Sequence, residues 1–291
     1  MRAGAVVEAR LRKILIPGRR GIAELDGDAE ALVEPLAPSL TEGAAFRAEI
    51  LREAIAESGR DKLAKARATD APLRAGPKLA ERLGRFVEPP VHGPDRFEEA
   101  AWSELLEQAA TGEVPFDGGA LRMSLTPAMT LFDVDGRLPP AGLARAGAAA
   151  AARAIRRFGI GGSIGIDLPT MPGRADRQAA AAAVDATLPQ PFERTAVNGF
   201  GFLQVVRRRE RPSIPEIVRA DPGAAAARAL LRRAGRLQGK VAIHAAPRVI
   251  LQLKARPLWL EELARRTGGE ALLFPNPGLA ISEGHVQTAQ S

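Results

Sequence analysis

The middle of the sequence, from residue 113 to residue 206, alternates between strand-like and helix-like segments, and this alternation restricts the possible folds more than any other feature. The strand-like segments are short and apolar, whereas the helix-like segments carry apolar residues at helical spacing. A strand–helix–strand unit tends to place its two strands side by side in one sheet. The predicted strands are 120–125, 129–134, 163–168 and 195–206, and the predicted helices are 143–158 and 174–188.

The segments on either side of this sheet have different patterns. Residues 1–70 alternate apolar and polar side chains in short runs separated by turn residues, which predicts a small β-barrel. Residues 71–97 are rich in proline and predict a loop, and residues 97–110 predict a helix. Asp221-Pro222 has the form of a helix N-cap and opens a compact α+β module. We therefore expect a mixed α+β and α/β fold with several domains.

The composition excludes several kinds of chemistry. The 291 residues include no cysteine, which excludes disulfides, thiolate metal sites and cysteine nucleophiles. Three histidines are too few to favour a classical zinc site, and aromatic residues make up only 4% of the chain. Neither a secretory leader nor an apolar run long enough to span a membrane is present in the sequence. We expect a cytoplasmic protein without a membrane partner.

Three aspartates lie at or near the carboxyl ends of two predicted strands of the central sheet. Asp133 and Asp135 end one strand and are two residues apart, so they point to the same side. Asp167 interrupts the next apolar strand, 163–168, which the strand–helix–strand unit places beside the first. Carboxylates at matching strand ends can share a Mg²⁺ ion, which prefers oxygen ligands and keeps several waters. The competing interpretation is that these aspartates only cap helices or form turns.

The positive charge of the chain is concentrated in one segment. The formal net charge is +7, from 41 basic and 34 acidic residues, and residues 207–240 hold ten basic and three acidic residues, again +7. A localised basic segment attracts phosphates. Arg207, Arg208 and Arg209 follow a predicted strand directly, and we expect them to form a phosphate clamp beside the aspartates. An ordinary arginine-rich surface is the alternative.

Three motifs resemble the ribonuclease E/G family. Residues 118–135 resemble the Gly-Gly strand of that family and the Ile-Asp-Ile-Asn motif that follows it. Residues 161–171, Gly-Gly-Ser-Ile-Gly-Ile-Asp-Leu-Pro-Thr-Met, resemble the family's second aspartate motif, and residues 199–207 resemble its Arg-Phe-Gly-Leu-Leu-Glu-Met-Thr-Arg segment. The motifs stand in the family's order and spacing. The resemblance covers residues 97–291 well and residues 1–70 more weakly.

The resemblance implies a domain organisation and a site. It implies an oligonucleotide-binding (OB)-like barrel, a linker with a remnant of a ribonuclease H-like subdomain, a DNase I-like α/β catalytic subdomain and a small C-terminal α+β domain. By the same resemblance, Asp133 and Asp167 match the aspartates that hold catalytic Mg²⁺, and Asp135 stands where the family has an asparagine. The implied boundaries are 1–70, 71–117, 118–211 and 212–291.

The implied function is that of a Mg²⁺-dependent endoribonuclease that cleaves single-stranded RNA to 5′-phosphate and 3′-hydroxyl products in RNA processing or decay. The chain departs from the family in three respects. It lacks the cysteines of the zinc-link near residues 208–215, so any homo-oligomer forms without that link. The region between barrel and catalytic part is too short for the family's 5′-phosphate sensor. Phe46 is the only aromatic residue of the expected barrel, and we expect it in the core.

Two other functions compete with this hypothesis. The first is a non-catalytic RNA-binding or assembly protein that keeps the fold and the basic segment. The missing sensor, the missing stacking aromatics and Asp135 in place of asparagine favour it, whereas the two metal aspartates in their strand contexts favour the enzyme. The second is a metal-dependent phosphodiesterase that acts on another substrate.

Overall fold

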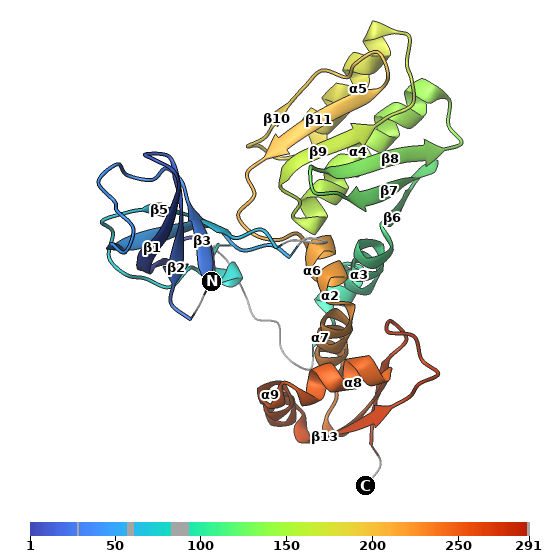
Figure 1. Cartoon of the computed structure of the whole chain (residues 1–291). Helices are drawn as coiled ribbons and strands as arrows, with labels where there is room; N and C mark the ends of the chain where they lie inside the picture. The colour runs from blue at the N-terminus through green and yellow to red at the C-terminus, as the bar shows by residue number, and fades with distance from the viewer. Residues whose placement is uncertain (28, 57–60, 83–92, 290–291) are drawn as a thin grey trace. The chain divides into compact units, whose positions relative to one another are not determined.

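The computed structural model describes residues 1–289 with gaps at residue 28, residues 57–60 and residues 83–92. The chain divides into two compact units, of which the first combines residues 1–86 with 111–216 and the second combines 87–110 with 217–291. The described residues contain a closed barrel, a six-stranded sheet and a three-stranded sheet, together with helices (Figure 1). The expected mixed α/β class with an N-terminal barrel is confirmed.

The first unit begins with the barrel, a closed sheet in the order β1-β2-β3-β5-β4, with β4 pairing back to β1. Every neighbouring pair is antiparallel except β3 and β5, which are parallel. Side chains alternate along each strand, so one set of small aliphatic residues fills the interior, and Phe46 packs against that core as predicted. The strands are β1 (Val6–Ile16), β2 (Arg20–Leu25), β3 (Glu30–Val33), β4 (Ala45–Arg52) and β5 (Ala64–Ala68).

The six-stranded sheet of the first unit has the order β10-β11-β9-β8-β7-β6. Strands β8 and β9 are parallel and are joined by helix α4 (Pro140–Phe158), as the strand–helix–strand pattern predicts. The other neighbouring pairs are antiparallel. Helix α5 (Arg174–Thr187) follows β9. The strands are β6 (Glu113–Phe116), β7 (Gly119–Leu125), β8 (Thr130–Gly136), β9 (Gly162–Asp167), β10 (Glu193–Arg194) and β11 (Phe202–Arg207).

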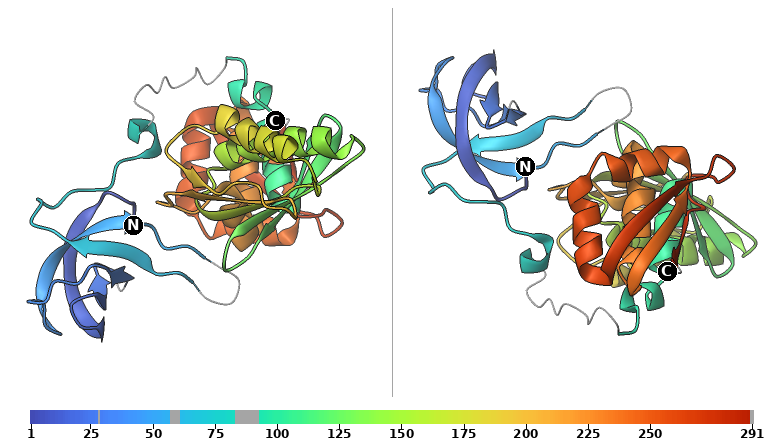
Figure 2. Two further views of the ribbon diagram at one scale, coloured as in Figure 1. Left: turned by 90° about the horizontal axis from the view of Figure 1, so that it is seen from above. Right: turned by 90° about the horizontal axis from the view of Figure 1, so that it is seen from below.

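Helices α4 and α5 pack against each other on one side of this sheet (Figures 1 and 2). Phe132 and Val134 of β8 are buried on the helix side. The contact is close, because a Cβ atom at Gly147 of α4 would lie 2.4 Å from Cγ1 of Val134. Leu131, Asp133 and Asp135 alternate with the buried residues, so they lie on the opposite side. We call that side the open face of the sheet.

Two predicted elements are shorter in the structure than expected. The helix expected at 97–110 is divided into α2 (Arg96–Glu99) and α3 (Trp102–Thr111), because Ala101 has a φ of 58° and cannot continue an α-helix. Of the strand expected at 195–206, residues 195–201 are not in a strand, and β11 begins only at Phe202. These interruptions depend on individual backbone angles and side-chain hydrogen bonds that hydrophobic periodicity does not indicate.

The second unit contains a three-stranded sheet, in the order β13-β12-β14, with helices packed on its apolar side. Asp221 caps α7 as predicted, because its side chain accepts a hydrogen bond of 3.0 Å from the backbone of Ala224. Among the described residues, no helix is both apolar enough and long enough to cross a membrane. The elements are α7 (Pro222–Ala234), β12 (Gly239–Ala245), α8 (Pro247–Lys254), α9 (Pro257–Thr267), β13 (Gly268–Pro275) and β14 (His285–Thr288).

Candidate functional site

Asp133 and Asp167 are direct partners in neighbouring strands. Asp133 lies in the middle of β8 and Asp167 ends β9, and the parallel register aligns their Cα atoms. Partners in register point to the same side of a sheet, and neighbouring strands are about 4.8 Å apart. Asp133 is half-buried and Asp167 is exposed. The structure therefore brings the two carboxylates together at the surface of the open face, on adjacent strands.

No described residue forms a hydrogen bond or an ion pair with either of these two carboxylates. Two negative charges about 5 Å apart repel each other by about 1–3 kcal/mol at the effective dielectric constants of protein surfaces and water. A bound cation would remove this repulsion. Carboxylate oxygens that are open to solvent suit Mg²⁺, which completes its coordination with water.

The described residues contain no group of three or more histidine, cysteine, aspartate and glutamate side chains that could hold a metal ion. The site thus offers two protein ligands rather than a full protein cage. This ligand set fits Mg²⁺ better than it fits a structural zinc ion, which takes four protein ligands.

The aspartate pair belongs to a row of side chains that crosses four strands. Arg122 on β7 is the register partner of Asp133, and Phe202 on β11 is the register partner of Asp167. The row on the open face is therefore a cation, two carboxylates and an aromatic ring. The Phe202 ring also covers Gly165, where an added Cβ atom would lie 2.6 Å from its Cζ atom. We call Arg122, Asp133, Asp167 and Phe202 the cross-strand row.

Asp135 lies on the same face as Asp133 and is exposed. Its Oδ2 atom is 3.1 Å from Nη1 of Arg122, and the side chains of both residues are more than half exposed. Exposed ion pairs of this kind contribute about 0–1 kcal/mol to stability. Arg122 can therefore exchange Asp135 for an anionic ligand at little cost.

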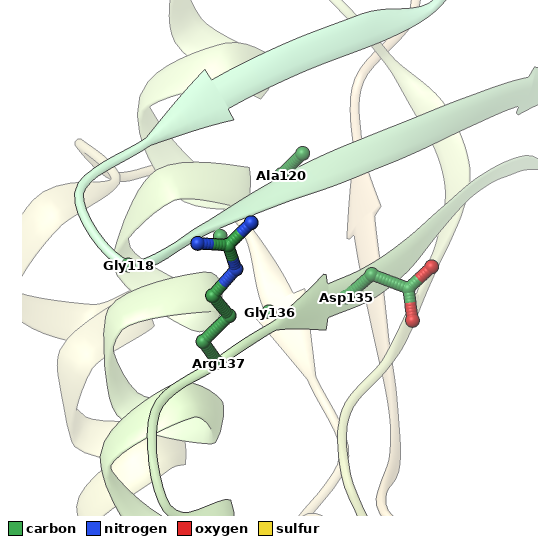
Figure 3. Close-up of a pocket in the computed structure, with 6 residues that line it drawn as sticks. Gly118, Ala120, Asp135, Gly136 and Arg137 are labelled. Atoms are coloured by element: carbon green, nitrogen blue, oxygen red, sulfur yellow. The ribbon is translucent and has the colours of Figure 1, made fainter.

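A shallow pocket of about 420 Å³ adjoins Asp135, where β7 begins and β8 ends (Figure 3). Its floor is open because glycines stand where side chains would not fit. A Cβ atom at Gly119 would lie only 2.3 Å from the carbonyl oxygen of Asp135. The Asp135 carboxylate points away from the Arg137 guanidinium in Figure 3. The lining residues are Gly118, Gly119, Ala120, Asp135, Gly136 and Arg137.

Arg207 ends β11, and Arg208 and Arg209 follow it. Arg207 does not lie beside the aspartates, so the expected position of the phosphate clamp is wrong. Strand β11 runs antiparallel to β9, and the register pairs Phe202 with Asp167 but Arg207 with Gly162. Arg207 is therefore five residues, or about 17 Å, from the aspartate end of the sheet. The sequence pattern indicated the strand but not its direction.

The local contacts of these arginines also differ from those of a phosphate clamp. Nη1 of Arg207 donates a hydrogen bond of 3.4 Å to the carbonyl of Ile160, and burial lowers the pKa of Arg207. Arg209 forms an ion pair with Glu216, and both side chains are largely buried. The side chain of Arg208 is 72% exposed, and its Nε atom lies 3.1 Å from Oε1 of Glu210. A role of Arg207, Arg208 and Arg209 in RNA binding stays a prediction.

Other arginines of the basic segment 207–240 stabilise the second unit. Nε of Arg219 donates a hydrogen bond of 2.9 Å to the carbonyl of Ala109, and Arg232 forms an ion pair of 2.6 Å with Asp95. Burial raises the pKa of Asp95, but its hydrogen bond from Arg232 helps to shift that pKa downward overall. Part of the positive charge that the sequence shows in this segment is thus used within the fold.

Sequence reasoning did not identify Arg122 or Phe202 as site residues. Alternation along 119–125 places Arg122 on one face of its strand, but only the register between strands shows that this face carries the aspartates. Comparison of the sequence with protein-family models and with curated proteins gave no match.

Proposed function

We propose that the protein is a Mg²⁺-dependent endoribonuclease of the ribonuclease E/G type that cleaves single-stranded RNA and leaves 5′-phosphate and 3′-hydroxyl ends. The observation that carries the proposal is the pairing of Asp133 and Asp167 in register on an exposed sheet face. The sequence resemblance assigns the metal to the same two residues, although the strand register is independent of it.

The residues of the row have separate roles in this proposal. Asp133 and Asp167 would hold Mg²⁺, which when bound neutralises charge on the phosphate and makes a bound water more acidic. Arg122 would leave Asp135 and bind a phosphate oxygen of the RNA backbone, because its guanidinium is exposed and always charged. Asp135 would then be free to accept a hydrogen bond from the attacking water.

We also propose the finer fold assignments that follow from the resemblance. A closed five-stranded barrel in the order β1-β2-β3-β5-β4 supports an OB-like barrel. The helix-backed six-stranded sheet would be the DNase I-like subdomain, because its open face carries the aspartates.

The alternative function is a non-catalytic RNA-binding or assembly protein of the same family. One observation favours it: Phe46, the only aromatic residue of residues 1–70, is partly buried against the barrel core, so the barrel offers little aromatic surface on which a base could stack. In that case Asp133 and Asp167 would be relics of a catalytic ancestor.

The proposal is tested by incubating the purified protein with fluorescent single-stranded RNA in the presence of Mg²⁺ or of EDTA. We expect cleavage only with Mg²⁺, and we expect the products to carry 5′-phosphate and 3′-hydroxyl ends. RNA that binds but remains intact with Mg²⁺, Mn²⁺ and Ca²⁺ would support the non-catalytic alternative.

A second prediction concerns the phosphate contact. Replacing Arg122 by glutamine should weaken RNA binding and reduce the slope of log K against log salt concentration by about 0.7, the value for one phosphate contact on a single strand. Salt titrations of RNA binding measure this slope. Arg145→Gln is the matched control, because Arg145 is exposed on α4, on the other side of the sheet. An unchanged slope for Arg122→Gln would show that Arg122 does not contact phosphate.

A further inference from the structure

Among the residues that the structure describes, Phe200 is the most exposed large hydrophobic residue, with 84% of its surface accessible. Exposed apolar residues are common, but a phenylalanine ring that packs on almost nothing in its own fold contributes little to stability. Phe200 lies in the turn that directly precedes β11. Its surroundings show whether this turn needs a phenylalanine.

The turn is held by groups other than the Phe200 ring. Oδ1 of Asn198 accepts hydrogen bonds of 3.0 Å from the backbone N–H groups of Phe200 and Phe202. Gly201 has a φ of 97°, and a Cβ atom there would lie 2.2 Å from the carbonyl oxygen of Leu168. Asparagine and glycine thus set the turn conformation. The ring at position 200 is presented by an ordered backbone and is not required for it.

The turn lies at the aspartate end of the sheet. Its carbonyl at Gly201 accepts a hydrogen bond of 3.2 Å from the N–H of Leu168, the residue after Asp167. The carbonyl of Phe200 accepts one of 3.4 Å from Oγ1 of Thr170. The turn that carries Phe200 is therefore attached, by one backbone hydrogen bond and one hydrogen bond from a threonine side chain, to the segment that directly follows a proposed metal ligand.

We infer that Phe200 stacks on an unpaired base of the RNA, next to the phosphate that lies at Asp133 and Asp167. The inference rests on the proposed function. Base–aromatic stacking tolerates any sequence and needs a single accessible ring face, whereas a protein partner needs a larger apolar patch. Asp167 and Thr170, in the segment that this turn contacts, are polar and exposed, and Phe202 is partly buried, so these described neighbours form no extended apolar patch around Phe200. With Arg122 at the other end of the cross-strand row, the RNA would be held on both sides of the aspartates.

The test compares RNA binding by the wild type with binding by Phe200→Ala, Phe200→Leu and Phe200→Trp. Binding is measured with fluorescent single-stranded RNA and Ca²⁺ in place of Mg²⁺, on gels that also report strand integrity. We expect Phe200→Ala to lower affinity about tenfold, which is about 1.4 kcal/mol, within the range for one stacked base. Phe200→Leu should lose most of the affinity, because leucine is apolar but has no ring, and Phe200→Trp should keep it. Leu258→Ala, which removes a side chain that is 73% exposed on α9, should have no effect.

A set of RNAs that each lack one base identifies the stacked position. One abasic RNA should bind the wild type about tenfold more weakly, and on that RNA Phe200→Ala should cause no further loss. The stacking assignment is overturned if Phe200→Ala lowers the affinity for every abasic RNA by the same factor. It is also overturned if Phe200→Ala binds intact RNA as tightly as the wild type does. Loss of self-association without loss of RNA affinity would overturn it too and would indicate a protein contact.

Cleavage is measured separately, so the two proposals can fail independently. If the wild type cleaves RNA with Mg²⁺ and Phe200→Ala binds RNA normally, the stacking proposal is wrong and the nuclease proposal stands. If Phe200→Ala binds RNA tenfold more weakly and the wild type does not cleave RNA, the stacking proposal stands and the nuclease proposal is wrong. A wild type that does not bind single-stranded RNA overturns both.

Discussion

Replacing Asp133 by asparagine should abolish Mg²⁺-dependent RNA cleavage while RNA binding is kept or improved. The substitution removes one of the two proposed metal ligands, so we expect the cleavage rate to fall at least about 1,000-fold, equivalent to roughly 4 kcal/mol in the activation free energy. It also removes a negative charge from a surface that would bind a polyanion, and this change favours binding. Single-turnover cleavage and equilibrium binding, measured on the same RNA, separate the two effects.

The matched control for this variant is Asp176→Asn. Asp176 is an exposed aspartate in the first turn of α5, on the side of the sheet away from the open face. It changes the net charge by the same amount, and we expect it to leave cleavage unchanged. A variant Asp133→Asn that still cleaves RNA with Mg²⁺ at the wild-type rate would show that Asp133 is not a catalytic ligand. Loss of both binding and cleavage, together with an altered circular dichroism spectrum, would indicate misfolding.

Replacing Phe132 by alanine should lower the free energy of unfolding by about 3–5 kcal/mol. Phe132 is fully buried in β8, on the helix side, immediately before Asp133. Its removal leaves a cavity between the sheet and α4, because the backbone of a central strand relaxes only partly. Urea denaturation followed by circular dichroism measures the loss, and hydrogen exchange of the β8 amides shows whether the loss lies in this sheet.

Phe200→Ala is the matched stability control, because it removes the same side chain from an exposed position. We expect it to change the free energy of unfolding by no more than about 0.5 kcal/mol. Phe132→Leu should recover most of the stability lost in Phe132→Ala, since it refills much of the cavity. If Phe132→Ala costs less than about 1 kcal/mol, β8 is not packed as the structure shows.

The position of the aspartate pair could be predicted from the sequence because it depends on one local rule. A strand, a helix and a strand in succession place two strands side by side, and Asp133 and Asp167 each follow an apolar run in one of these strands. Strand β8 nevertheless continues past Asp133 to Gly136. The alternation of apolar and polar residues likewise predicts the barrel, although it does not predict the order of its strands.

The rest of the site depends on how distant strands pair, which the sequence alone does not indicate. The predicted position of Arg207 is wrong because β11 runs antiparallel to β9. The last residue of β11 therefore lies beside the first residue of β9, at the end of the sheet away from Asp167. Arg122 was missed because its place in the row depends on the register of β7 with β8. The turn at Phe200 depends on side-chain hydrogen bonds from Asn198.

The cross-strand row also bears on the shape of the RNA that can lie on it. Adjacent strands of a sheet are rotated against each other by about 20–25°, so three steps from β7 to β11 turn the surface by about 60–75°. Arg122 and Phe202 therefore face directions that differ by most of a right angle. A duplex is stiff and has a fixed helical geometry, whereas an unpaired strand can rotate about its backbone bonds from one nucleotide to the next. If the protein binds RNA as we propose, the twist of the sheet would select a flexible strand before any base is read.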